Sequence, residues 1–202
     1  MAENYLKTLI HLSENIYECS EKIDVQPSEL WNDDFFKKDW FKQTNNNNKY
    51  ITQSPGWYWI GCNVSFEELQ KTEVSFNETL PKSGCKIKAL SKANYKTFGE
   101  QYLCKLDDFE SRIIYNGHQG NILTRIRQHF TLNNENTGAL GLKYYPMSGK
   151  NWTIRYFGKP HIKRLPKGLQ SDVGSIISKQ SGRIAIENAW RAKNGWPILC
   201  KA

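Results

Sequence analysis

Residues 112–130, which read R-I-I-Y-N-G-H-Q-G-N-I-L-T-R-I-R-Q-H-F, contain the clearest change of pattern in the chain. The first four residues are β-prone and predict a short strand. From Asn121 onward apolar residues recur at helical spacing, and asparagine is a favoured N-cap, so a helix is predicted over residues 121–130. Helical geometry places Arg125 and His129, four residues apart, together on the border of the buried face. Both side chains are therefore expected to face a cleft.

Two further strands and a last helix surround this stretch. β-prone aromatic or alternating residues predict strands over residues 56–62 and 151–157. The last helix is predicted over residues 181–193. Within it, Glu187 takes the same half-buried border position as the basic pair of the first helix. We therefore expect three side chains with chemical function to converge.

The first 50 residues differ from the rest and are expected to form an N-terminal helical extension. Apolar residues predict helices over Tyr5–Lys22 and Leu30–Phe41. The polar run Gln43–Asn48 then marks the expected boundary. Residues 51–202 are expected to form the main domain, with an insertion at about 63–110 between its first two strands.

Charge is distributed unequally along the 202 residues, whose formal net charge is +8. Residues 1–110 hold 13 Lys and Arg against 17 Asp and Glu, whereas residues 111–202 hold 15 against 3. A basic excess of this size attracts polyanions and supplies counterion-releasing contacts, so nucleic acid is the expected partner. The alternative is a basic surface that serves only solubility.

Other classes of protein are excluded by composition. Because no apolar run reaches the roughly 18 residues of a membrane-spanning helix and the N-terminus lacks a signal-peptide pattern, we expect a cytoplasmic protein without a membrane partner. The five cysteines are scattered and include no Cys-x-x-Cys pair. This argues against a disulfide framework and against a zinc ribbon.

Short motifs follow one another in a distinctive order. They are Gly56-Trp57-Tyr58, then Tyr115-Asn116-Gly117, then Arg125 and His129, then Glu187, and finally Pro197-Ile198-Leu199-Cys200. Each motif alone is more often structural, but their order and spacing resembles the GIY-YIG nuclease family over residues 55–62 and 112–202. Three positions depart from the family pattern. Trp57 and Asn116 stand where it prefers aliphatic residues, and Cys200 stands where it has a supporting Asn.

The resemblance implies both a fold and a catalytic site. The fold is α/β (α+β), a small central antiparallel sheet of about three strands flanked by helices. The reaction is phosphodiester hydrolysis with one divalent ion, Mg²⁺ or Mn²⁺, held by Glu187. Arg125 would bind the scissile phosphate, and Tyr58 or Tyr115 would be the general base, with His129 accepting or relaying the proton. Because a free tyrosine has a pKa of about 10, activity is expected to rise toward alkaline pH.

Two basic segments are expected to contact double-stranded DNA. One is the lysine-rich insertion, which either reads DNA or only packs against the domain. The other is the segment Gly158–Gly168, whose composition suits backbone phosphates. The predicted DNA-binding residues are Lys86, Lys88, Arg127, Lys159, Lys163, Arg164 and Lys167.

The expected function is that of a sequence-specific DNA endonuclease of the type II restriction class. A compact chain without a zinc module fits this class better than the repair, homing and junction-cutting relatives. Cleavage of both strands requires a homodimer or sequential nicking, and a cognate methyltransferase is expected to be encoded nearby. The alternatives are a stand-alone structure-specific, repair or toxin nuclease, and a catalytically silent DNA-binding module of the same fold.

Overall fold

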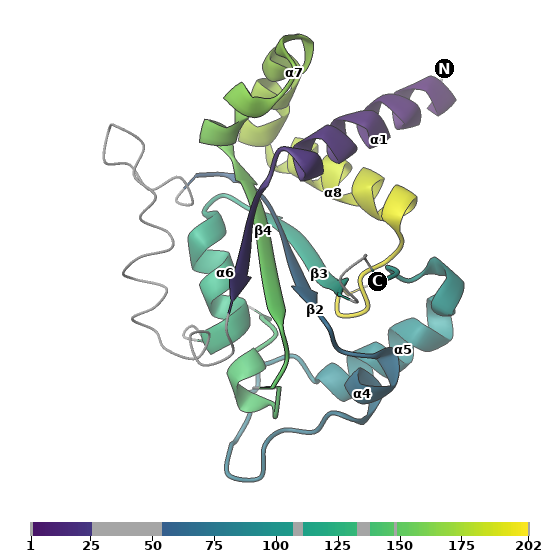
Figure 1. Ribbon diagram of the computed structural model, residues 1–202, viewed down its shortest axis with the longest axis vertical. Coiled ribbons are helices and arrows are strands. Elements are labelled where there is room, and N and C mark those ends of the chain that lie inside the picture. Colours follow the sequence, from purple (N-terminus) through teal and green to yellow (C-terminus); the bar gives the residue numbers. More distant parts are fainter. Residues whose placement is uncertain (1, 26–53, 107–110, 133–137, 148, 202) are drawn as a thin grey trace.

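The computed structural model describes residues 2–25, 54–106, 111–132, 138–147 and 149–201 (Figure 1). Its centre is a four-stranded antiparallel sheet in the order β1-β4-β2-β3. The strands are β1 (Glu21–Val25), β2 (Gly56–Cys62), β3 (Arg112–Gln119) and β4 (Trp152–Gly158). The predicted class, a small antiparallel sheet flanked by helices, is confirmed, with one strand more than the three expected.

Strand β2 is an inner strand of the sheet, and each of its seven residues is buried. It pairs with β3 on one side and with β4 on the other. Because side chains alternate across a strand, Trp57 and Trp59 enter one hydrophobic core while Tyr58 and Ile60 enter another. The continuous apolar composition of this strand follows from the helices that cover both faces of the sheet.

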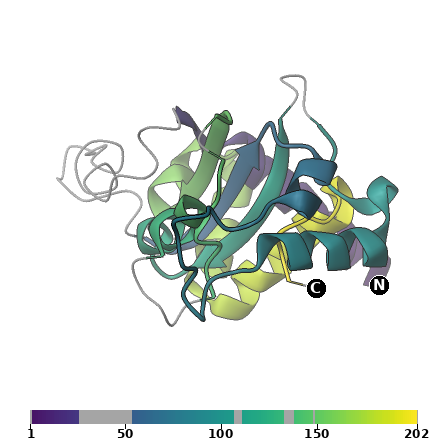
Figure 2. The ribbon, with the colours of Figure 1, turned by 90° about the horizontal axis from the view of Figure 1, so that it is seen from below.

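Helices cover the two faces of the sheet (Figure 1). The face with Trp57 packs against α1 (Ala2–Glu18), α7 (Lys167–Ser178) and α8 (Gln180–Asn194). The opposite face packs against α6 (Ile122–Thr131), α4 (Phe66–Lys71) and α5 (Ile87–Phe98). Figure 2, which looks from the lower end of Figure 1, shows α4 and α5 at that end of the molecule.

The N-terminal segment differs from its prediction. Helix α1 ends at Glu18, whereas the sequence predicted a helix as far as Lys22, and the next residues form strand β1. The helix ends because the amide and the hydroxyl of Ser20 both donate to the carbonyl oxygen of Tyr17. Strand β1 then pairs with an edge of β4 that lies far away in the sequence. Local periodicity does not reveal such a partner.

Most of the other predicted elements are present with small differences at their ends. Strand β2 has its predicted bounds, and β4, α6 and α8 agree within one residue. Asn121 caps α6, since its side chain accepts the N–H of Thr124 at 3.1 Å. Strand β3 is longer than predicted because residues 116–119 also pair with β2. The helix predicted over Leu30–Phe41 and the polar run Gln43–Asn48 lie outside the described residues.

The segment between β2 and β3, predicted as an insertion, contains α4, α5 and the 3₁₀ helix η2 (Glu100–Tyr102). Its helix α5 packs against the C-terminal segment, residues 195–201, which follows α8. The side-chain amide of Asn94 donates to the backbone carbonyls of Ile198 and Cys200, both at 2.7 Å. The insertion therefore holds the C-terminal segment against β3, where Leu199 N–H donates to the carbonyl of Ile114 at 2.9 Å.

We predict that Gly56→Ala lowers the free energy of unfolding by about 2 kcal/mol or more. A Cβ at this position would lie 1.9 Å from the carbonyl oxygen of Phe157, in the backbone of the paired strand β4. Urea unfolding followed by tryptophan fluorescence measures the loss. Gly174→Ala on α7 is the matched control, because nothing lies within 4 Å of its added Cβ. Equal stabilities of the two variants would contradict this account of the β2–β4 contact.

Candidate active site

Four elements contribute side chains to one cavity beside β3, one of the two edge strands of the sheet. Tyr58 comes from β2, Tyr115 from β3, Arg125 from α6 and Glu187 from α8, and all four line a cavity of about 530 Å³. The other lining residues are Gly117, His118, Gln119, Asn121, Thr124 and Gln128. His129 is fully buried and contacts the hydroxyl of Tyr58. The structure thus brings together the five residues singled out as catalytic from the sequence.

Gly117 makes room for the ring of Tyr58. The two residues lie directly opposite each other in the β2–β3 pair. A Cβ at Gly117 would lie 2.5 Å from the hydroxyl oxygen of Tyr58 and 3.2 Å from Cε1 of Tyr115. The glycine two residues after Tyr115 is therefore required by space, because the tyrosine ring occupies the volume that any side chain would fill.

The hydrogen bonds of His129 determine which ring nitrogen carries its proton. Nδ1 accepts the backbone N–H of Leu140 at 3.3 Å. Burial, with a smaller effect from Arg125, holds the pKa of His129 well below its usual value, so the ring is neutral and its one hydrogen is on Nε2. Nε2 therefore donates to the hydroxyl oxygen of Tyr58 at 2.9 Å. In this arrangement His129 is a donor to Tyr58, whereas the resemblance implied a proton acceptor or relay.

The two tyrosines lie against each other, with ring centroids 6.1 Å apart and an angle of 19° between the rings. Burial is the main cause that raises both pKa values, to about 12 for Tyr115 and well above the usual value for Tyr58. Their mutual interaction raises the pKa of Tyr58 and lowers that of Tyr115. Tyr115 is also partly exposed, whereas Tyr58 is 1% exposed.

Arg125 brings a permanent positive charge to the same cavity. Its guanidinium donates to Oε1 of Gln128 at 3.3 Å, within the cavity wall. The charge lowers the pKa of both tyrosines and so opposes the effect of burial on them. A planar guanidinium suits the binding of two oxygens of one phosphate. Arg125 is therefore placed to bind a phosphate beside the tyrosine hydroxyls.

Glu187 is the only carboxylate among the described residues that line this cavity. Its side chain is 13% exposed, and Oε1 accepts from Nη2 of Arg191, one turn later on α8. Oε2 lies 3.8 Å from Nε2 of His118. Burial raises the pKa of Glu187 to about 6, against the opposing effects of the Arg191 charge and the His118 backbone N–H. A cation in the cavity would favour the ionised carboxylate.

Two residues near the Glu187 carboxylate, His118 and Arg191, were not predicted from the sequence. His118 lies in the cavity wall, and burial lowers its pKa to about 4, so its ring is neutral at physiological pH. Nothing in its sequence context distinguishes it from an ordinary strand residue. Arg191 had an available signal, because residues four apart on a helix are neighbours and Glu187 precedes it by four.

The departures from the family pattern at Asn116 and Cys200 lie in contact with each other. The Cys200 thiol accepts the backbone N–H of Asn116 at 3.4 Å and donates to its backbone carbonyl at 3.3 Å. Asn116 in turn accepts from Arg191 Nε at its side-chain oxygen, at 2.8 Å, and from Nη2 at its carbonyl, at 3.3 Å. Neither residue lines the cavity. Asn116 instead binds Arg191, the ion-pair partner of Glu187 on α8, and Cys200 contacts Asn116.

The donors of the cavity fit a hydrated divalent cation. Across the described ranges no three Asp, Glu, His or Cys residues gather as a complete metal cage. Mg²⁺ does not need one, since it keeps several water ligands and is often held by one or two carboxylates together with substrate phosphates. Glu187 lines the cavity, and its Oε2 is the oxygen that does not accept from Arg191. It is the residue that would hold the cation.

One group of predicted DNA-binding residues begins beside the N-terminus of α6, the helix that carries Arg125. The amide of Lys159 donates to the side chain of Ser54, whose carbonyl accepts the N–H of Ile122 at the start of α6. The predicted loop is partly helical, since it contains the 3₁₀ helix η4 (Lys159–Arg164). Arg164 forms an ion pair with Glu21 at 2.6 Å. The exposed basic residues of this segment are Lys159, Lys163, Arg164 and Lys167.

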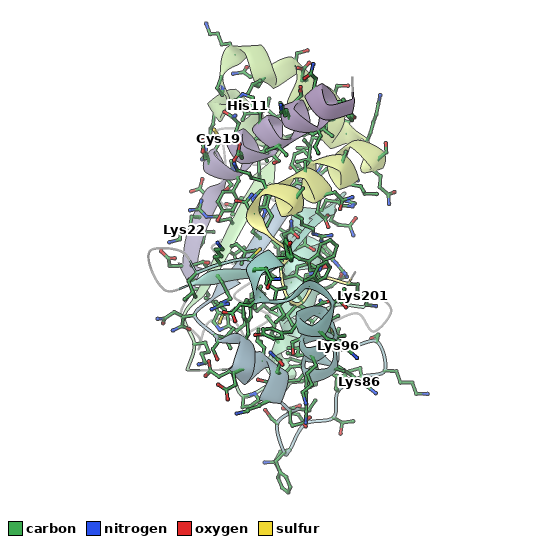
Figure 3. All side chains as sticks on the ribbon, turned by 90° about the vertical axis from the view of Figure 1, so that its right-hand side faces the viewer. His11, Cys19, Lys22, Lys86, Lys96 and Lys201 are labelled. Carbon is green, nitrogen blue, oxygen red and sulfur yellow. The ribbon has the colours of Figure 1, made fainter. Side chains whose placement is uncertain are left out.

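The other predicted DNA-binding residues lie away from the cavity. Lys86 and Lys88 line a second cavity of about 700 Å³ beside α5. Lys88 is ion-paired with Glu73. Figure 3 shows Lys86, the residue before α5, and Lys96, in its last turn, on the same side of the molecule as Lys201. Arg127 is partly buried on α6 and does not line the cavity that contains Arg125.

Comparison of the chain with known protein families, with curated proteins and with solved structures found no match. In the described part of the chain, no helix combines the length and the apolar character needed to cross a membrane. A functional conclusion therefore rests on the chemistry of the cavity and on the sequence pattern that predicted it.

We predict that Glu187→Gln stabilises the metal-free protein at neutral pH but not in acid. The carboxyl has a pKa of about 6 when folded against 4.5 as its ordinary value, so the folded state binds this proton more tightly. The resulting stabilisation is complete below pH 4.5 and is lost as the pH rises through 6, a change of about 2 kcal/mol. The Gln side chain has no proton to lose.

Urea unfolding of both proteins in chelator, at about pH 4 and about pH 7.5, tests this prediction. The stability of the variant relative to the native protein should increase between the two conditions. A difference that stays constant would contradict the raised pKa.

Proposed function

We propose that this chain is a sequence-specific endonuclease that hydrolyses double-stranded DNA with a divalent cation, Mg²⁺ or Mn²⁺. The observation that carries the proposal is the convergence of Tyr58, Tyr115, Arg125 and Glu187 on one cavity from four separate elements. These residues could supply a base, a phosphate ligand and a metal ligand, the parts that phosphodiester hydrolysis requires. The resemblance to the GIY-YIG nucleases and the basic C-terminal half of the chain support the same conclusion.

Arg125 and Glu187 divide the charge stabilisation between them. Arg125 binds the non-bridging oxygens of the scissile phosphate as negative charge builds on them. Glu187 would hold a divalent cation, which when bound would supply a Lewis acid for the reaction. Because the carboxylate is largely buried, its charge is little screened by water and its interaction with a cation is strong.

Tyr115 is the better candidate for the general base. It is partly exposed in the cavity, where a water molecule can reach it, and its pKa is the less strongly raised of the two tyrosines. His129 Nε2 donates to Tyr58, whose own hydroxyl hydrogen is then available to the oxygen of the neighbouring Tyr115. Each such donor would stabilise negative charge on the next oxygen. Tyr58 and His129 therefore support the phenolate that Tyr115 must form.

The DNA backbone is expected to follow the basic surface of η4. Lys159 begins this helix next to the N-terminus of α6, Lys163 and Arg164 follow along it, and Lys167 begins α7. Such contacts position DNA without reading its sequence. A single cavity cuts one strand, so cleavage of a duplex requires a homodimer or two successive nicks. A type II restriction role further requires a methyltransferase that protects the same site, whose gene we expect to lie nearby.

We predict that the purified protein cuts phage or plasmid DNA into discrete bands only in the presence of Mg²⁺ or Mn²⁺. Glu187→Gln should reduce the rate by about 1,000-fold or more, because the proposed metal ligand is lost. Glu78→Gln, on an exposed loop, is the matched control and should cut normally.

Gel electrophoresis of the products separates the alternatives. A metal-dependent smear would replace the restriction role by that of a stand-alone structure-selective, repair or toxin nuclease. DNA binding without cleavage in either metal would overturn the catalytic proposal in favour of a silent binding module.

We predict that the cleavage rate rises with pH between about 6 and 9, because the tyrosine base must lose its proton. Tyr115→Phe should abolish this rise and most of the activity. Tyr58→Phe should retain more activity, with the rise shifted to higher pH, because it loses only a donor to the phenolate. Tyr102→Phe, at a tyrosine that is 65% exposed, is the control. A flat profile would argue against any tyrosine base, and a more severe effect at Tyr58 would transfer that role to it.

A further inference from the structure

The Glu187 carboxylate forms an ion pair with Arg191, which does not line the cavity and has no role in the proposed reaction. Arg191 donates to Glu187 Oε1 from the next turn of α8. Its side chain is 11% exposed, and its guanidinium lies over the ring of Trp196, 4.5 Å from the ring centroid. An exposed pair of this spacing contributes little, but this pair is enclosed. Water therefore screens it less than it screens an exposed pair.

Asn116 holds the guanidinium in place. It offers Arg191 two acceptors, its side-chain oxygen for Nε at 2.8 Å and its backbone carbonyl for Nη2 at 3.3 Å. Asn116 lies within β3 and is 2% exposed, so it cannot turn toward water. The planar fork of an arginine can bind Asn116 and Glu187 at once, whereas a lysine ammonium lacks this rigid geometry. An arginine between a buried asparagine and a glutamate is therefore suited to hold its guanidinium in one orientation.

The C-terminal segment completes this arrangement. Cys200 contacts the backbone N–H and carbonyl of Asn116 through its thiol, and Trp196 donates from its indole N–H to the carbonyl of Cys200 at 3.1 Å. Cys200 and Asn116 are two of the positions at which the chain departs from the GIY-YIG pattern. These two residues contact each other, and Asn116 connects both of them to Arg191.

We propose that Arg191, held by Asn116 and Cys200, is a positioning residue for the metal ligand Glu187. It fixes Oε1 and so leaves Oε2 for a divalent cation. This inference rests on the proposed function, because it assigns a support to the metal ligand of the same site. Partners that orient a metal-binding side chain typically contribute about 10- to 100-fold to metal affinity or activity.

Two other roles for Arg191 lead to different expectations. If the ion pair only joins two turns of α8, changes at Asn116 would leave cation binding untouched. If Arg191 instead competes with the cation for Glu187, loosening its hold would tighten cation binding. Asn116→Val separates these roles, because it removes the side-chain acceptor for Nε while both charges of the ion pair remain. Valine is also a strand-forming residue, so β3 should be retained.

The experiment measures Mn²⁺ binding by electron paramagnetic resonance, together with the kcat and KM of DNA cleavage. We expect Asn116→Val to bind Mn²⁺ about 10-fold more weakly and to lower kcat with little change in KM for DNA. Arg191→Lys, which keeps the charge but loses the fork, should show a similar loss. Asn77→Val, an exposed change of the same chemistry, is the control and should match the native protein. Circular dichroism identifies the variants that fold.

The outcomes separate this inference from the proposed function. Unchanged or tighter Mn²⁺ binding in a folded Asn116→Val or Arg191→Lys protein would overturn the positioning role while leaving the nuclease intact. Native protein that binds Mn²⁺ no better than Glu187→Gln would overturn the metal site itself, and the positioning role with it. Two variants are used so that a folding failure in one leaves the other to decide.

Discussion

Strand β2 is buried on both faces, and the alternation of its side chains determines what each face of the sheet accommodates. Tryptophans enter the core beneath α1 and α8, while Tyr58 enters the core beneath α6. A shift of one residue in its pairing would exchange these sets and remove the tyrosine from the cavity. Gly117, directly opposite on β3, leaves the space that the tyrosine ring needs. The register of β2 therefore determines both the packing of the sheet and the position of Tyr58 in the cavity.

Burial keeps the titratable groups of the cavity in their less charged forms. His129 is neutral, both tyrosines hold their protons, and the pKa of Glu187 is raised. Arg125 and the enclosed Arg191 carry the permanent charges. A cavity of this kind is matched to ligands that bring charge with them, since a phosphate and a divalent cation would each find a partner there. The cost of charging these buried groups would then be offset when such a ligand binds.

The site also depends on parts of the chain that never reach the cavity. The insertion holds the C-terminal segment through Asn94, and that segment contacts Asn116 through Cys200. Asn116 in turn binds Arg191, which binds Glu187. The carboxylate is thus connected by direct contacts to α5, nearly 100 residues earlier in the sequence. Functional geometry of this kind requires support by packed neighbours, because a long side chain alone populates many rotamers.

Local signals in the sequence predicted several of the elements. Strand β2 and helices α6 and α8 follow from β-prone composition, helical periodicity and an Asn cap, whereas the five proposed catalytic residues were predicted from the order and spacing of motifs that resemble a nuclease family. Features that depend on distant partners emerge only in the folded protein. Strand β1 exists because β4 has a free edge, and His129 is a donor because Leu140 occupies its other nitrogen. The link from Cys200 to Glu187 likewise joins segments that only folding brings together, and no local pattern encodes such a contact.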